Sequence, residues 1–218
     1  MTSTDLTERY RQSRGEFWHA VGEPGAPRGP LGEADQSALW PSGSSSYLRV
    51  STVHSGIVAT DGLSDPAVPT QPGQTGAGPG AEIYVESTEL TEEHLGEARW
   101  LVTALEEAAG AIAGAPDSFA SALAEHGLLS LELSATDVPE DWAADGRLGA
   151  LVGVELPGRT PGFEIDGAQV RALTFTPLRP SELAVITAEG PAGRQRVAEA
   201  LAGQGWYSYA DTLRPAVL

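Results

Sequence analysis

One short run of this sequence carries residue types that could do chemistry. It is Asp61-Gly62-Leu63-Ser64-Asp65, followed directly by Pro66. Two carboxylates and a hydroxyl at the end of a strand could form a dispersed polar site, in which a carboxylate of shifted pKa works beside a histidine or an arginine. The same residues suit an Asx turn, where short side chains accept backbone N–H bonds and Gly62 takes a positive φ. Because such turns far outnumber catalytic sites, we predict an architectural turn, and Asp61, Gly62, Leu63, Ser64 and Asp65 are also our candidate binding residues.

Other catalytic or metal-binding patterns are not found in the sequence. The segment Gly62–Pro66 has proline where the second glycine of a Gly-x-Ser-x-Gly nucleophile elbow would stand. Without cysteine, thiol nucleophiles, disulfide frameworks and cysteine zinc sites are excluded. No two of the four histidines lie within five residues of each other, so none forms a metal-ligand pair: His19, His54, His94 and His126. We therefore expect no cofactor, no metal and no enzymatic activity, with an enzyme using the Asp61–Asp65 turn as an alternative.

The charge of the chain restricts its partners. Thirty acidic residues stand against 13 basic ones, all of them arginine, for a net charge of −17. This balance argues against nucleic-acid binding and against an anionic membrane surface. It favours a basic protein as the partner, since opposite charge speeds association. A second alternative is an acidic mimic of nucleic acid, which would need carboxylates spaced regularly on one face.

Targeting signals are also missing from the sequence. The first six residues, Met1–Leu6, have neither the basic nor the apolar region of a signal peptide. No apolar run approaches the roughly 18 residues that a membrane-spanning helix needs. We therefore expect a cytoplasmic protein.

The elements that must position these residues follow from the apolar patterning. Alternation and turn residues predict a hairpin over 47–60 and strands at 82–87, 128–133, 148–156 and 169–176, with a turn at 157–162. Helices are expected at 5–21, from Thr91 to about 112, and at 117–125, 181–189 and 191–202. The apolar stripe of the second helix should pack on the sheet through Ile83, Val85, Val152, Val154 and Leu173; the stripe is Leu95, Ala98, Val102, Leu105, Ala109 and Ile112.

The order of these elements predicts a single α+β domain with a mostly antiparallel sheet and helices packed on it. Residues 1–46 are interpreted as an N-terminal helix followed by a Pro- and Gly-rich tether. Residues 47–218 are interpreted as the α+β domain itself. Residues 66–81 contain four prolines and four glycines, which predicts a flexible insertion.

Three stretches together resemble the suppressor-of-fused domain family in its bacterial form. The first is Thr60–Pro66, with its Gly-Leu-Ser-Asp turn, between the hairpin and the strand Glu82-Ile83-Tyr84-Val85-Glu86. The second is Leu173–Leu178 leading into Pro180-Ser181-Glu182-Leu183. The third runs from Gly190 through Arg194, Val197 and Leu201 to Leu213-Arg214-Pro215. The resemblance covers roughly residues 47–215, and the insertion at 66–81 departs from it.

This resemblance implies a protein-binding module rather than an enzyme. In the animal members, a peptide of a transcription factor adds a strand between two domains. The present chain has no counterpart of the second domain, so that clamp does not carry over. Some bacterial relatives occur in toxin–immunity systems, and an acidic immunity-type or regulatory protein would suit the charge of −17.

Overall fold

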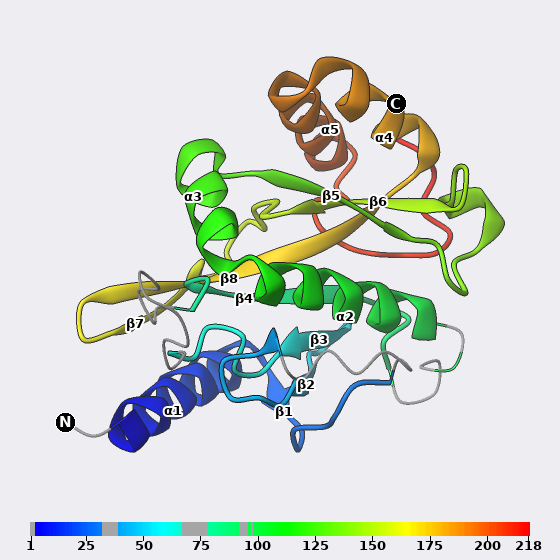
Figure 1. Cartoon of the computed structure of the whole chain (residues 1–218). Helices are drawn as coiled ribbons and strands as arrows, with labels where there is room; N and C mark the ends of the chain where they lie inside the picture. The colour runs from blue at the N-terminus through cyan, green and yellow to red at the C-terminus, as the bar shows by residue number, and fades with distance from the viewer. Residues whose placement is uncertain (1–2, 32–38, 67–77, 92–95, 97) are drawn as a thin grey trace.

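A computed structural model describes residues 3–31, 39–66, 78–91, 96 and 98–218 (Figure 1). Within them, helices pack on a mixed, mostly antiparallel sheet of eight strands, which confirms the predicted α+β class. The helices are α1 (Ser3–Val21), α2 (Arg99–Gly114), α3 (Pro116–His126), α4 (Pro180–Glu189) and α5 (Pro191–Gly203). The strands are β1 (Glu23–Pro24), β2 (Tyr47–Ser51), β3 (Gly56–Thr60), β4 (Ala81–Ser87), β5 (Leu129–Ser134), β6 (Arg147–Val152), β7 (Gly162–Ile165) and β8 (Ala168–Leu178).

The sheet is joined at its centre by β8. Its order is β1-β2-β3-β4-β8-β6-β5, and β7 also pairs with β8. All neighbours are antiparallel except β4 and β8, which run parallel with Ile83 opposite Leu173. The predicted hairpin is confirmed as β2 and β3, with Val50 opposite Ile57. Because β8 spans 11 residues, its first half joins the β4 side of the sheet and its second half joins β6.

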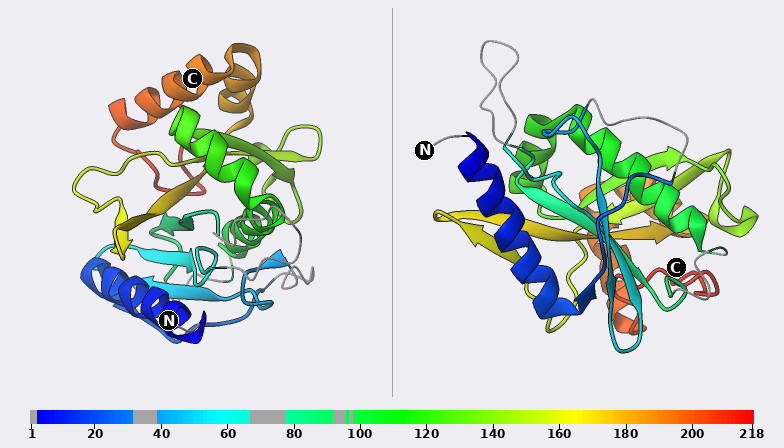
Figure 2. Two further views of the ribbon diagram at one scale, coloured as in Figure 1. Left: turned by 60° about the vertical axis from the view of Figure 1, so that its left-hand side comes forward. Right: turned by 90° about the horizontal axis from the view of Figure 1, so that it is seen from below.

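Helices cover both faces of the sheet (Figures 1 and 2). On one face α2 and α3 pack in a single core with the inward residues of β4 and β6, such as Ile83 and Val152. On the opposite face α1 covers β2, β3 and β4 with Trp18 against Tyr84. The same face is covered at its other end by α4 and α5, through Val197 and its neighbours. The alternation of side chains along each strand produces these two cores.

Several predicted boundaries are wrong. The helix expected from Thr91 begins at Arg99 with Ala98 as its N-cap, and Leu95 of its stripe lies outside the described residues. The strand expected over 148–156 ends at Val152, because Gly153 takes a φ of +97° and turns the chain out of the ladder. Val154 consequently packs with α4 and α5 instead of under α2.

The ends of the predicted insertion meet at the Asp61–Asp65 turn. The flexibility predicted for the insertion concerns mainly residues 67–77, which lie outside the described residues. Gly78, where the described chain resumes, lies so close to the turn that a Cβ there would be 2.6 Å from the Asp65 carbonyl oxygen. The insertion therefore leaves and re-enters the fold at one place.

The C-terminal tail is fixed by a buried ion pair. The Arg214 guanidinium donates to both carboxylate oxygens of Glu182, at 2.6 and 2.8 Å, and neither side chain is exposed. The same carboxylate accepts the N–H of Arg179, the N-cap residue of α4, and that of Val217 in the tail. Arg179 also stacks on Trp142, with its guanidinium carbon 4.1 Å from the ring centroid.

Candidate functional site

The five predicted site residues form a turn that leads out of β3 and lies against β4. Its centre is the carboxylate of Glu82, which is fully buried on β4. Three consecutive backbone N–H groups donate to this carboxylate, those of Gly62, Leu63 and Ser64, at 3.1 to 3.3 Å. The Ser64 hydroxyl donates to it at 2.6 Å, and the Thr60 hydroxyl also donates to it. The turn is therefore wrapped around a buried anion that belongs to the protein itself.

Arg14 of α1 completes this cluster from the other side. Its Nε donates to Asp61 at 2.6 Å and its Nη1 to Asp65 at 2.7 Å, while Glu82 lies 3.4 Å away. Burial lowers the pKa of Arg14, but the carboxylates of Glu82, Asp65 and Asp61 outweigh it and hold the pKa above its ordinary value. Burial raises the pKa of Asp65 above its ordinary value, against the lowering effect of Arg14.

The structure thus brings together all five predicted residues and adds two that the sequence did not indicate, Arg14 and Glu82. Every polar side chain in the group bonds to another member of the group. Leu63 packs in the α2 core without exposure. This geometry fits the architectural interpretation of the turn. None of the five lines the cavity beside the loop that connects β6 to β7.

The face of β4 that carries Glu82 also carries Tyr84 and Glu86, and all three are buried. Glu86 accepts from the Arg159 guanidinium at 2.7 Å and from the Ser55 hydroxyl at 2.6 Å. Arg159 also lies over the ring of Tyr84, 6.0 Å from its centroid. Each buried carboxylate of β4 is therefore paired with an arginine from a distant segment, as a charge inside a protein requires.

Arg159 belongs to a loop that separates β6 from β7. Val152 of β6 is opposite Phe175, and Gly162 of β7 is opposite Arg171. The chain therefore advances ten residues from β6 to β7 while β8 covers the same stretch with four. Six residues therefore leave the ladder between β6 and β7. The sequence predicted a turn at 157–162, and β7, which begins at the end of this turn, was missed. Residues 153–161 form this bulge loop, a feature often found at functional sites.

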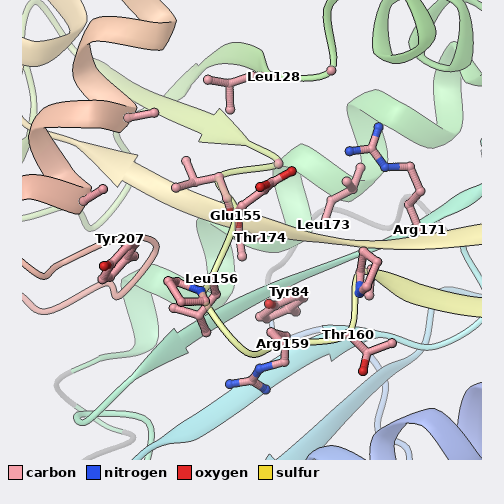
Figure 3. Close-up of a pocket in the computed structure, with 18 of the residues that line it drawn as sticks. Tyr84, Leu128, Glu155, Leu156, Arg159, Thr160, Arg171, Leu173, Thr174 and Tyr207 are labelled. Carbon is pink, nitrogen blue, oxygen red and sulfur yellow. The ribbon is translucent and has the colours of Figure 1, made fainter.

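Beside the bulge loop lies a cavity of about 820 Å³, a size typical of ligand sites. Figure 3 shows Arg159 and Thr160 of the loop beside Tyr84, and Arg171 extending from β8. The middle of β8, the residues just before β5, one side of α5 and the chain after α5 supply the other walls; they include Leu128, Leu173, Thr174, Ala198, Ala202 and Tyr207.

A second exposed feature is the open edge of β5. In the part of the chain that the structure describes, β5 pairs only with β6 and ends the sheet. Ala135 donates its N–H to Gly146 beside β6, whereas Ser134 donates its N–H away from β6, to Glu107 of α2. Successive residues of a strand point their N–H and C=O groups to opposite sides. The N–H and C=O groups of Ser130 and Glu132 therefore lie on the open edge.

Exposed carboxylates lie on β5 and in the connection that follows it. Glu132 is half exposed, and the Arg147 guanidinium lies 3.7 Å from it. The connection from β5 to β6 adds further exposed carboxylates: Asp137, Glu140, Asp141 and Asp145. Asp141 bonds to Arg179.

The comparisons with known proteins leave these features to be interpreted from their geometry. A scan against protein-family models finds no match for the chain, and a search of curated proteins finds none either. Among the described residues, no helix is long and apolar enough to cross a bilayer. Among the same described residues, no group of three or more histidine, aspartate or glutamate side chains is placed to hold a metal ion. His19, His54 and His126 are exposed, and His94 lies outside the described residues.

Proposed function

We propose that this chain is a cytoplasmic, non-catalytic protein-interaction module that binds a basic partner protein. The partner adds an extended segment to the open edge of β5. The observation that carries this proposal is the set of N–H and C=O groups of Ser130 and Glu132 on the open edge of β5, beside the exposed carboxylate of Glu132. Strand addition uses such groups for affinity, and the surrounding charge selects the partner.

Two further observations support a binding role. The chain carries a net charge of −17, which attracts a basic protein over a distance and speeds its association. The buried carboxylates Glu82, Glu86 and Glu182 are each engaged by arginine and by other donors. Their contacts are those of structural ion pairs. A module of this kind agrees with the resemblance to the suppressor-of-fused family, which remains a prediction here, as do its toxin–immunity associations.

A charged residue on an edge strand can also serve to prevent aggregation, and the experiment must distinguish that role from partner binding. A glutamate such as Glu132 discourages edge-to-edge aggregation. The two roles predict different effects of proline at position 130. Because the Ser130 N–H points away from β6, Ser130→Pro removes an open donor and leaves the β5–β6 ladder intact.

The test compares proteins retained from a native extract by the wild type and by three variants. We expect a basic protein to be retained by the wild type and by Glu23→Lys, a control that reverses an exposed charge on the opposite edge strand, β1. Ser130→Pro and Glu132→Lys should each reduce its retention at least about tenfold, equivalent to about 1.4 kcal/mol. Raising the salt from about 50 to about 300 mM should also weaken it.

Circular dichroism checks that Ser130→Pro and Glu132→Lys are folded. If Ser130→Pro then retains the partner as well as the wild type does, no partner strand pairs with β5. If retention depends on Asp61 or Asp65 instead, the partner binds at the Asp61–Asp65 turn. Turnover of a substrate that is lost in Asp65→Asn would favour the enzyme alternative.

A further inference from the structure

Glu107 of α2 occupies one end of the open edge of β5. Its carboxylate accepts the Ser134 N–H at 2.8 Å and the Ser134 hydroxyl at 2.6 Å. The Ser134 N–H points away from β6, so the carboxylate oxygen takes the position that a carbonyl oxygen of a neighbouring strand would take. The fold therefore closes its own sheet edge at Ser134. An added strand has the N–H and C=O groups of Ser130 and Glu132 to pair with.

The two faces of β5 differ at these positions. Leu131 lies on the face of α2 and α3, where it is only partly buried against their core. Ser130 and Glu132 lie on the opposite face, because successive side chains of a strand alternate. A residue of an added strand has its side chain on the same face as the residue opposite it. An apolar side chain opposite Leu131 would therefore cover the part of Leu131 that is still exposed.

The Glu132 carboxylate is open to a basic side chain. None of the described residues donates a hydrogen bond to it, and the Arg147 guanidinium lies 3.7 Å away. This separation is longer than that of a hydrogen bond, so both carboxylate oxygens are able to accept from a further donor. Ser130, two positions earlier on the same face, is small and uncharged. This face therefore favours a basic side chain opposite Glu132 and a polar one opposite Ser130.

We propose that the open edge of β5 selects a three-residue sequence in its partner: an arginine or lysine opposite Glu132, then an apolar residue opposite Leu131, then a polar residue opposite Ser130. This order along the partner follows from antiparallel pairing, which is more stable per residue than parallel pairing. Ser130 and Glu132 then each exchange two hydrogen bonds with the residue opposite, and the partner leaves the sheet at Glu107. The proposal rests on strand addition to β5, proposed above, and specifies the sequence that is added.

The probe is a phage-displayed library of random heptapeptides, panned in parallel against the full wild-type chain and against Ser130→Pro. Peptides enriched by the wild type and not by Ser130→Pro should share the basic, apolar, polar order. Two further variants check its positions. Glu132→Lys reverses the charge of the edge, so it should enrich acidic residues in place of basic ones. Leu131→Thr removes most of the apolar contact and should lose the preference for an apolar residue. Thermal unfolding checks that each variant is folded.

The role of Glu107 is measured with one enriched peptide, synthesised and titrated into the full chain by calorimetry. Glu107→Ala and Glu107→Gln remove the same charge, but only glutamine retains an acceptor for the Ser134 N–H. In Glu107→Ala the edge is open to one more residue of the peptide. We therefore expect Glu107→Ala to bind the peptide at least about threefold more tightly than Glu107→Gln does. Equal affinities of the two variants would show that Glu107 does not limit the pairing.

The possible outcomes separate the sequence preference from strand addition itself. If Ser130→Pro enriches the same peptides as the wild type, or the wild type enriches none, no strand is added to β5 and both proposals are wrong. If enrichment depends on Ser130 but the peptides lack the basic, apolar, polar order, strand addition stands and the sequence preference is wrong. The same conclusion follows if Glu132→Lys enriches the same peptides as the wild type.

Discussion

A carboxylate is stable inside a protein only when donors replace the water that it has lost. For Glu82 the donors come from a turn that wraps around it, and the counter-charge comes from α1 through Arg14. The turn can take this shape because Gly62 has a φ of +109°. That conformation is unfavourable for residues with a Cβ. Gly62 and Glu82 are thus two halves of one structural feature.

The first prediction concerns Gly62. A Cβ at this position would lie 3.0 Å from the Asp65 carboxylate that binds Arg14. Gly62→Val therefore adds backbone strain and disturbs the ion pair, and we expect it to lower the free energy of unfolding by about 1–3 kcal/mol. Chemical denaturation measures this. The control is Gly29→Val, at an exposed glycine with open space around it, which should change the value by less than about 0.5 kcal/mol. A Gly62→Val protein as stable as the wild type would rule out the architectural interpretation.

The sequence identified the turn but not its partners. Asp61, Gly62, Ser64 and Asp65 are neighbours in the chain, and their residue types suit a turn in any fold. Arg14 lies 47 positions before Asp61, so its contact exists only after α1 packs on the sheet. Glu82 and Glu86 alternate with apolar residues, a pattern that normally indicates one solvent-facing side. Here α1 and the bulge loop bury that side, which no local pattern can show.

At the level of elements, α2 gives the clearest link between pattern and packing. Its buried residues form groups that begin every four positions, at 100–102, 104–106, 108–110 and 112–113. Leu105 is completely buried among them. We predict that Leu105→Ala lowers the free energy of unfolding by about 2–5 kcal/mol, through lost burial and the cavity left behind. Urea titration measures the change.

The matched control for this prediction is Thr103→Ala, two residues away on the same helix. Its hydroxyl bonds only to the carbonyl of Arg99 in its own helix, so its loss should cost less than about 1 kcal/mol. Comparable losses in the two variants would mean that the face of α2 toward the sheet has been misassigned.

The bulge loop is the element that the sequence described least well. Residues 157–162 contain proline and glycine in a pattern typical of a turn, and no strand was predicted over 162–165, where β7 lies. The structure shows that β7 resumes the ladder on β8 after six residues have left it. How β6 and β7 align with β8 depends on two distant segments of the chain, and neither segment shows it alone. The sequence therefore predicted the strands beside the cavity but not the cavity itself.

At the scale of the whole molecule, the dominant property is negative charge. Its isoelectric point is about 4.4, so the folded state carries self-repulsion at neutral pH. Burial raises the pKa values of Asp65 and Glu82 above their ordinary values, with Arg14 acting in the opposite direction. Both properties make the folded protein take up protons more readily than the unfolded chain does.

The last prediction follows from this difference in proton uptake. A carboxyl group whose pKa is raised on folding favours the folded state when protonated, and this contribution is lost as the pH rises from its ordinary pKa through its raised one. Lowering the pH from 7 toward about 5, still above the isoelectric point, should therefore increase the free energy of unfolding. Urea titrations at several pH values measure it. In Asp65→Asn the pH dependence should be shallower, because one of the two groups no longer titrates. Added salt at pH 7 should also stabilise the wild type, because it screens the repulsion. A steady fall in stability from pH 7 to about 5 would show that carboxylates stabilised by ion pairing outweigh these two buried groups.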